Sequence, residues 1–252
     1  MAYPTETSRQ PVGSAGELEL WSADMAQAER RGADLYPLLS EDERERAARF
    51  HGKQQRARFI YGRALLRMLL GHYTGSAPAR LRFNYGAKGK PVLLVEDGVA
   101  ACYFNLAHSG ERLLIALTTV GEIGVDIEAL SARFDLEDMA RRICTPRERA
   151  RWLALPCARR APALLACWTR KEAYLKGVGC GLEQRLTELD VSGAQPRGAA
   201  CADTWYLHDV DLGDEYVAAV AVAGKIGSQP QVRDCSELDR QSSLHRAFPD
   251  RF

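Results

Sequence analysis

The chain has 252 residues, which is enough for one large domain or two small ones with an ample apolar core. Its 34 basic and 33 acidic residues give a net charge of +1, which argues against general attraction to nucleic acid or to a membrane surface. Seven cysteines without a C-x-x-C pair are typical neither of a disulfide framework nor of a zinc site. No apolar run approaches the roughly 20 residues of a spanning helix, and residues 1–16 lack the apolar core of a secretory signal. The sequence therefore predicts a cytoplasmic protein.

The first half of the chain predicts a strand, two helices and then four short strands. Residues 17–21 alternate between apolar and polar, which predicts the first strand. Ser40 and Glu43 have the spacing of a capping box and predict a helix over residues 41–50. A second helix, over about 54–72, has an apolar stripe at helical spacing. The four strands are predicted at residues 81–83, 91–94, 103–107 and 113–117.

The second half repeats this order. Residues 123–128 predict its first strand. Thr145 and Glu148 form a second capping box, 105 positions after the first, with Pro146 at the first helical position. A long helix is predicted over 163–176. Three strands follow it, at residues 186–191, 205–209 and 216–222.

The two long helices also align with each other. Each residue of the first has a counterpart 109 positions later, as in Phe59 with Trp168, Arg63 with Glu172, Ala64 with Ala173 and Arg67 with Lys176. The sequence thus predicts an α/β (α+β) fold of two pseudo-repeated halves, residues 17–118 and 119–224, with one active site at their interface. Residues 1–16 and 225–252 are polar and aperiodic, so we expect loose termini there.

Two carboxylates share one face of the strand predicted at 123–128. Asp126 and Glu128 lie two residues apart, beside Gly124. Neighbouring like charges repel unless a cation lies between them, and pairs of hard oxygen ligands suit Mg²⁺. The alternative is that both carboxylates form the solvated side of an edge strand.

A third carboxylate lies on the second long helix. Glu172 and Lys176 are four residues apart on one helical face. A surface ion pair, which is nearly neutral in energy, would explain this spacing too. However, Arg63 stands opposite Glu172 in the repeat, so the fold requires no acid there, and Glu172 beside Asp126 and Glu128 would complete an oxygen-ligand site.

Five segments, in order from about residue 17 to residue 222, together resemble the signature of the 4′-phosphopantetheinyl transferases, and more narrowly of the two-half, surfactin-synthetase-activating type. They are Gly-Arg (62–63), Gly-Lys-Pro (89–91), Phe-Asn-Leu-Ala-His-Ser (104–109), Gly-Val-Asp-Ile-Glu (124–128) and Trp-Thr-Arg-Lys-Glu-Ala-Tyr-Leu-Lys (168–176). The small trimeric holo-acyl-carrier-protein synthases share the Asp and Glu signature but consist of one half, so the internal repeat argues against them.

The resemblance implies an enzyme that transfers the phosphopantetheine arm of coenzyme A to a serine of an apo acyl or peptidyl carrier protein and releases 3′,5′-ADP. Asp126, Glu128 and Glu172 match the ligands of Mg²⁺, with Mn²⁺ as an alternative ion. Lys176 matches the lysine that holds the pyrophosphate. Glu172 also matches the candidate general base, although a metal-bound carboxylate is a weak base and a bound water is the alternative.

Further positions match the family's contacts to the adenosine part of coenzyme A. His108 matches a histidine at the 3′-phosphate, and Arg46 matches a basic residue there. Glu43 stands where some relatives have a second lysine, so Arg63 or Lys53 would supply the missing charge. The loop that matches the surroundings of the adenine and the 3′-phosphate includes Lys88, Lys90 and Pro91.

Residues 129–144 match the family's carrier-docking region. Carrier proteins are acidic around their serine, and the segment offers complementary arginines and apolar side chains. They are Arg133, Arg141, Arg142, Phe134, Leu136 and Met139. The alternative is that the arginines are ordinary solvated surface.

Two other classes of protein compete with the transferase. A non-catalytic coenzyme A or nucleotide-binding module of the same fold would keep the cations but could lose a metal ligand, and all three carboxylates are present. A Mg²⁺-dependent hydrolase of another fold would need a phosphate motif such as G-x-x-x-x-G-K-[ST], which the chain lacks. We expect a monomer that binds one coenzyme A. The sequence leaves open whether its carrier belongs to fatty acid, polyketide or nonribosomal peptide synthesis.

Overall fold

The computed structural model describes residues 18–86, 89–94, 102–131, 135–179, 186–198, 204–227 and 230–238. Its strands are β1 (Leu18–Asp24), β2 (Arg82–Tyr85), β3 (Pro91–Leu94), β4 (Tyr103–Ser109), β5 (Arg112–Thr118), β6 (Ile123–Ala129), β7 (Trp205–Val210), β8 (Tyr216–Ala223) and β9 (Val232–Asp234). Its α-helices are α1 (Ala28–Leu35), α2 (Glu41–Ala48), α3 (Lys53–Thr74), α4 (Leu136–Ile143), α5 (Pro146–Leu153) and α6 (Cys157–Val178). Short 3-10 helices are η1 (Met25–Gln27), η2 (Tyr36–Leu38), η3 (Pro78–Arg80) and η5 (Leu186–Glu188).

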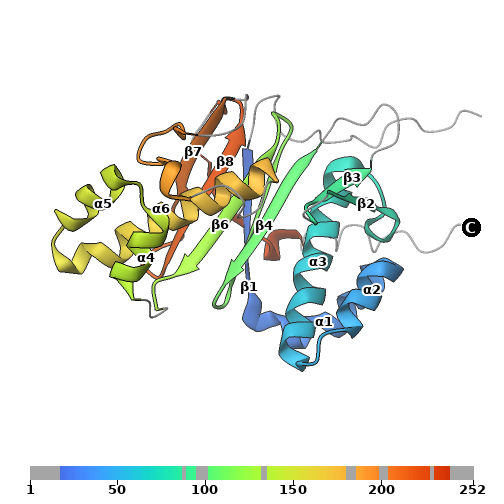
Figure 1. The fold of residues 1–252 in the computed structure, drawn as a ribbon. Coiled ribbons are helices and arrows are strands. Elements are labelled where there is room, and N and C mark those ends of the chain that lie inside the picture. The colour runs from blue at the N-terminus through green and yellow to red at the C-terminus, as the bar shows by residue number, and fades with distance from the viewer. Residues whose placement is uncertain are drawn as a thin grey trace, which may run out of the picture.

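Each half contains a sheet with the same topology, flanked by one long helix (Figure 1). In the first half β1 pairs with β5, and β5 pairs with β4, all antiparallel. In the second half β6 pairs with β8, and β8 pairs with β7, again antiparallel. The first strand of each half thus pairs with the last strand of its closing hairpin. The α+β class and the two-half fold are confirmed.

The ends of the long helices correct the predicted alignment. Both α3 and α6 have 22 residues, and each ends at a glycine with positive φ, Gly75 (68°) and Gly179 (75°), the usual conformation of a helix C-cap. These glycines lie 104 positions apart, so the predicted offset of 109 is wrong. Met68, and not Arg63, is therefore the counterpart of Glu172. The first half still has no acid at this position.

The capping-box glutamates support this alignment. Glu43 Oε2 accepts the N–H of its own N-cap residue and a hydrogen bond from Arg67 Nε at 2.6 Å. Glu148 Oε2 accepts the corresponding N–H and a hydrogen bond from Lys171 Nζ at 2.7 Å. All four charged side chains are buried. The same buried ion pair therefore joins the short helix to the long helix in each half, and its two cations lie 104 positions apart.

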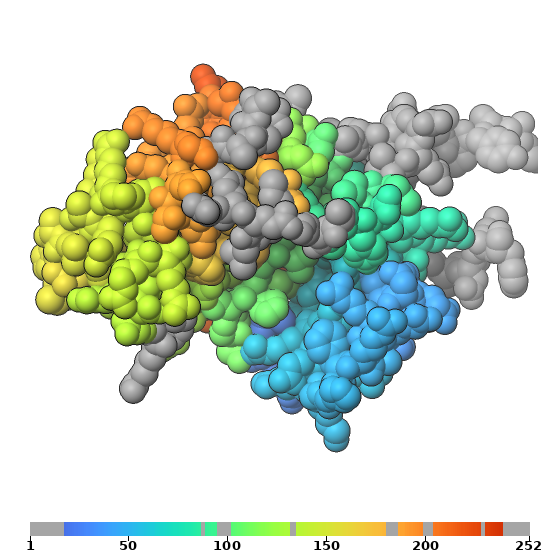
Figure 2. Space-filling model, viewed as in Figure 1, coloured from blue at the N-terminus to red at the C-terminus, as the bar shows by residue number. Residues whose placement is uncertain are grey.

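The two halves share one apolar core. Leu20 and Leu114 of the first half and Val125 and Val220 of the second belong to a single cluster of buried side chains. Strands β4 and β6 lie side by side, and residues 103–129 (green) lie between the two lobes of the surface (Figures 1 and 2). The Val125 N–H donates across this junction to Asn105 Oδ1 at 3.1 Å. The packing of the halves therefore fixes how their side chains face each other.

Three local predictions are wrong. Residues 186–191 form η5 and an isolated bridge in place of a strand, because the Leu186 carbonyl and the Val191 N–H bond to buried side chains. Helix α6 begins at Cys157, six residues before the predicted start, and it includes Pro162 in its interior. Residues 230–238 are not a loose tail. Strand β9 pairs in parallel with β1, and Cys235 and Leu238 are buried in the first-half core.

No helix in the described ranges has both the length and the apolar character needed to cross a membrane.

Candidate active site

Strand β6 directs the Asp126 carboxylate toward helix α6. Only 5% of this residue is exposed, and its Oδ1 accepts a hydrogen bond from Lys176 Nζ at 2.6 Å. The second oxygen, Oδ2, is buried without a hydrogen-bond partner. Burial raises the pKa of Asp126 to about 6, although the Lys176 ammonium acts in the opposite direction. An orphaned carboxylate oxygen of this kind fits a site for a cation.

Gly124 sets the distance between this strand and the helix. A Cβ at Gly124 would lie 2.0 Å from the Ala173 carbonyl oxygen and 2.3 Å from the Gly177 nitrogen. Only glycine therefore allows β6 to lie this close to α6. This close packing brings Asp126 of the strand within reach of Lys176 of the helix.

Glu172 and Glu128 lie beside Asp126, and they differ in their hydrogen-bond partners. Glu172 Oε1 is buried without a partner, and burial raises the pKa of the carboxyl group. Glu128 accepts hydrogen bonds from Trp168 Nε1 at 3.2 Å and from Ser109 Oγ at 3.0 Å. Glu128 is thus positioned by one donor from each half. No sequence spacing links Trp168 or Ser109 to Glu128, so these contacts are decided by the folded chain alone.

The three carboxylates fit a divalent cation on chemical grounds. They supply hard oxygen ligands, two of which have no protein partner. Repulsion from Glu128 raises the pKa of Asp126 and of Glu172, and repulsion from Glu172 adds to the rise at Asp126. In the described part of the chain their ligand atoms do not form a group within 4.8 Å of one another. The Lys176 ammonium pairs with Oδ1 of Asp126, and Oδ2 has no hydrogen-bond partner.

This environment leads to a pH prediction. Asp126→Asn should stabilise the metal-free protein more at pH 7 than at pH 4, by on the order of 2 kcal/mol. The folded-state pKa of about 6 lies above the ordinary value of 3.8, so stability is lost as pH rises through this interval. Urea unfolding in EDTA at both pH values measures the difference. An equal effect at both would contradict the raised pKa.

His108 on β4 faces a cluster of positive charge. Partial desolvation lowers its pKa, as do the nearby Arg58 and Lys176. Arg58, on α3, donates to the Gly110 carbonyl at 2.9 Å and pairs with Glu111. Arg58 was absent from the predicted site, because its position depends on how α3 packs against the β4–β5 turn. The cluster can attract an anion.

Arg63 is less available than predicted. Its side chain is buried, its Nε pairs with Glu43 at 3.0 Å, and its Nη2 contacts the Tyr85 hydroxyl at 3.3 Å. Burial lowers the pKa of Arg63, and its Nη1 has no hydrogen-bond partner. Glu43 therefore pairs with two buried arginines of the first half, Arg63 and Arg67.

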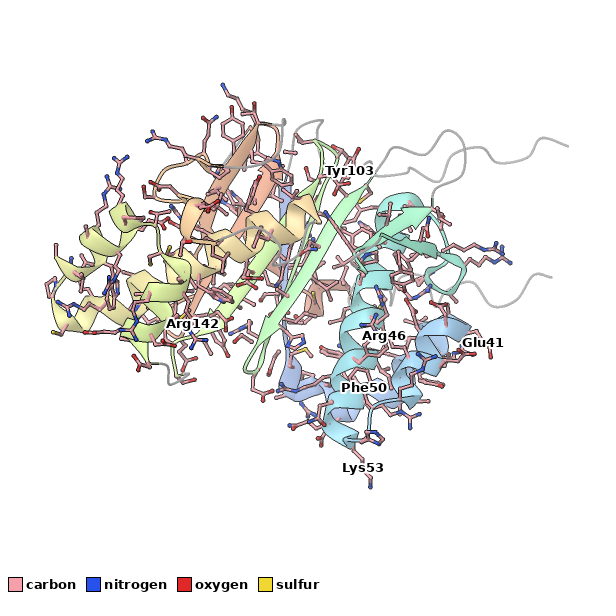
Figure 3. All side chains as sticks on the ribbon, viewed as in Figure 1. Glu41, Arg46, Phe50, Lys53, Tyr103 and Arg142 are labelled. Carbon is pink, nitrogen blue, oxygen red and sulfur yellow. The ribbon has the colours of Figure 1, made fainter. Side chains whose placement is uncertain are left out.

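Two further cations predicted to serve the first-half phosphate site, Arg46 and Lys53, lie on the surface. Arg46 is exposed and lies over the Phe59 ring of α3, 5.3 Å from its centroid (Figure 3). Lys53 starts α3 and points away from the rest of the molecule (Figure 3). Of these two, only Arg46 lies next to Arg63, whose pKa it lowers.

Lys90 joins the two halves. Its ammonium donates to three acceptors of the second half, which are Glu122 Oε2 at 2.5 Å, the Ile123 carbonyl at 3.1 Å and the Gly177 carbonyl at 2.6 Å. Lys90 would have to leave one of them to bind a phosphate. Pro91 begins β3, opposite Tyr85. Lys88 lies outside the described residues.

The predicted docking segment includes helix α4. Arg142, 77% exposed, and Arg141 both pair with Asp138 on the same helix (Figure 3). Leu136 and Met139 pack against the cluster of buried residues that α4, α5 and α6 form. The exposed part of α4 is therefore mainly charged. Arg133 and Phe134 lie outside the described residues.

Comparisons with known proteins match both halves. Residues 122–221 match the model of the 4′-phosphopantetheinyl transferase superfamily, and residues 23–120 match the model of the N-terminal part of such enzymes. The chain is 38% identical over 217 residues to 4′-phosphopantetheinyl transferase HetI of Nostoc sp., which covers 85% of this chain and 91% of the relative. It is 27% identical over 197 residues to a 4′-phosphopantetheinyl transferase of Bacillus subtilis, covering 75% and 84%. It is 33% identical over 136 residues to AcpT of Escherichia coli, covering 54% and 64%.

Proposed function

Because this chain belongs to the 4′-phosphopantetheinyl transferase superfamily and is an enzyme of that class, we propose that it moves the 4′-phosphopantetheine arm of coenzyme A to a carrier-protein serine in a Mg²⁺-dependent reaction. The products are the holo-carrier and 3′,5′-ADP. The two-half, surfactin-synthetase-activating type is part of this proposal. One observation carries it: Asp126 Oδ2 and Glu172 Oε1 are buried without partners beside Lys176.

Asp126, Glu128 and Glu172 would hold Mg²⁺, or Mn²⁺ in its place. When bound there, the ion supplies charge that stabilises the phosphorus under attack and the departing phosphate. Lys176 would exchange its hydrogen bond to Asp126 for one to the pyrophosphate. Glu172, whose pKa is raised, would accept the proton of the serine hydroxyl, with water as the alternative base.

The first half would bind the 3′-phosphate of coenzyme A. Arg58 and Arg46 are its available cations, His108 would add a hydrogen bond to the phosphate, and the loop with Lys88, Lys90 and Pro91 would surround the adenine. Arg63 would contribute only its unpartnered Nη1. Arg141 and Arg142 on α4 would attract the acidic carrier. We propose a cytoplasmic monomer, with no nucleic-acid or membrane partner.

Mass spectrometry tests this function directly. Several purified apo-carrier proteins, incubated with coenzyme A and Mg²⁺, should each be examined for the added mass of one phosphopantetheine. Transfer to at least one carrier supports the proposal. Coenzyme A binding without transfer to any of them would favour the non-catalytic module.

His108→Ala should raise the KM for coenzyme A roughly tenfold, about 1.4 kcal/mol, but leave the KM for dephospho-coenzyme A nearly unchanged. The reason is that only coenzyme A carries the 3′-phosphate. Lys176→Ala should impair both substrates alike, since both contain the pyrophosphate. Equal losses with the two substrates in the His108 variant would remove His108 from the 3′-phosphate site.

The shared core predicts that neither half works alone. Residues 1–118 and 119–252, expressed separately, should aggregate or remain inactive, because each would expose apolar residues such as Leu20 or Val125. Calorimetry on the full chain should give one coenzyme A per monomer, since the carboxylates of the second half have no counterparts in the first. Two coenzyme A per chain, or an active second half, would contradict this arrangement.

A further inference from the structure

The second half contains a cavity of about 290 Å³ for which the proposed reaction has no use. It lies beside helices α5 and α6 and extends to Val191. Apolar side chains, including Trp152, Leu155 and Leu164, line much of it, and Cys144 and Cys167 line it as well. A space of this size admits molecules much larger than water, whose share of liquid volume is about 30 Å³.

The two cysteines are close to each other. Their sulfur atoms and a carboxylate oxygen of Glu148 all lie within 4.8 Å of one another, the only such group of three potential metal ligands that the described residues contain. Cys144 is buried between α4 and the N-cap of α5, and Cys167 is half-buried on α6. Both are free thiols. Helix packing has thus brought together two thiols that are far apart in sequence.

A metal ion fits this group poorly. Glu148 Oε2 accepts hydrogen bonds from the Thr145 N–H at 2.8 Å and from Lys171 Nζ at 2.7 Å. Its Oε1 accepts the Val191 N–H at 2.8 Å. A divalent cation would have to displace the buried Lys171 ammonium, whose charge it would also oppose. The chemistry left to this group is that of two thiols.

The surroundings favour a thiolate at Cys144. A hydrogen bond from the Cys167 thiol lowers the pKa of Cys144, and the positive charges of Lys171 and Arg149 act in the same direction, while burial and the Glu148 carboxylate oppose them. Cys144 is the C-cap residue of α4 and precedes the N-cap of α5, so the dipoles of the two helices act on it in opposite directions. The pKa of Cys167 is raised, so this residue keeps its proton. Cys144 is therefore the thiol that reacts first, and Cys167 is the thiol that reacts second.

We propose that Cys144 and Cys167 form an oxidisable dithiol site, which a peroxide entering the cavity converts into an intramolecular disulfide. The Cys144 thiolate attacks one peroxide oxygen, the O–O bond breaks, and hydroxide leaves as water after taking up a proton. Cys167 then attacks the sulfur of the sulfenic acid, the S–S bond forms, and a second water leaves. Two thiols lose two electrons and two protons, and one peroxide becomes two waters. Coenzyme A, Mg²⁺ and a carrier are not needed.

Peptide mapping of the full chain tests this site. The reduced protein, freed of reductant, is treated with hydrogen peroxide, its remaining thiols are blocked with N-ethylmaleimide in denaturant, and it is digested with trypsin without reductant. We expect a linked pair of peptides, residues 143–147 and 161–170, two hydrogens lighter than the separate peptides together. Dithiothreitol should separate the pair. Recovery of both peptides in the alkylated form would overturn the proposal.

Three controls separate a built site from random oxidation. Cys157→Ser removes the exposed cysteine of α6 and should leave the linked pair unchanged. Cys144→Ser should abolish it. The same treatment in concentrated urea should lower its yield several-fold, because unfolding separates α4 from α6. A yield that is equal in urea, or links from Cys144 to other cysteines as often as to Cys167, would also overturn the proposal.

Discussion

Replacing Asp126 with alanine is expected to lower kcat/KM for arm transfer by at least about 10³-fold while the protein stays folded. The change removes the orphaned Oδ2 and the acceptor of the Lys176 ammonium, and thus the proposed metal ligand and the partner that positions the lysine. Losing a group that stabilises transition-state charge has an effect on the order of several kcal/mol. A coupled assay of holo-carrier formation measures the rate, and a thermal melt confirms folding.

Replacing the two neighbouring carboxylates with alanine should lower the activity by different amounts. Glu172→Ala should be as severe as Asp126→Ala, because its Oε1 is also orphaned. Glu128→Ala should be milder, since Trp168 and Ser109 already bind both of its oxygens. The matched control is Asp209 of β7, an exposed carboxylate that pairs with Arg170 of helix α6. The Asp209→Ala variant should keep the activity of the unmodified enzyme. If EDTA leaves the rate of the unmodified enzyme unchanged, the metal assignment is wrong.

Replacing Lys171 with methionine is expected to lower the free energy of unfolding by about 3–5 kcal/mol. The Lys171 ammonium is fully buried and donates to Glu148 and to two carbonyls, those of Ile143 and Leu186. Its loss would leave Glu148 as a buried charge without a counter-ion and two carbonyls without donors. Urea unfolding monitored by tryptophan fluorescence measures the change.

Two further variants test whether the burial of the ion pair causes the loss of stability in Lys171→Met. Arg67→Met removes the equivalent cation from Glu43 of the first half and should destabilise the protein less than Lys171→Met, because Glu43 keeps Arg63 as a buried counter-ion. Arg142→Met removes an exposed ion pair with Asp138, which should contribute at most about 1 kcal/mol. A loss below about 1 kcal/mol for Lys171→Met would contradict the role given to the buried pair.

Short-range signals in the sequence were reliable where the interaction itself is short-range. The capping boxes at Ser40 and Thr145 begin helices as predicted, because each joins residues three positions apart. The alternation that predicts β6 is also local, and it places Asp126 and Glu128 two residues apart on one strand. The pattern at 186–191 failed, because its backbone groups bond to Lys171 and Glu148, which are distant in sequence.

The partners of the charged side chains could not be predicted in this way. Arg63 and Lys90 were expected to face a phosphate, but one pairs with Glu43 and the other with acceptors of the opposite half. Arg58 beside His108 was not foreseen at all. The charge of a residue is read from its identity, whereas its partner depends on which distant segment the core packs against it.

The sequence by itself determined the two-half α+β fold, the family and the carboxylates on which the proposed site is built, because alternation, capping and motif order are properties of neighbouring residues. The tertiary structure alone decided the alignment of the halves, the addition of β9 to the first sheet, and the contact of Asp126 with Lys176. Each of these depends on a close approach between segments far apart in the chain, such as β6 against α6 at Gly124. The proximity of Cys144 to Cys167 has the same origin, since it arises only when α4 packs on α6.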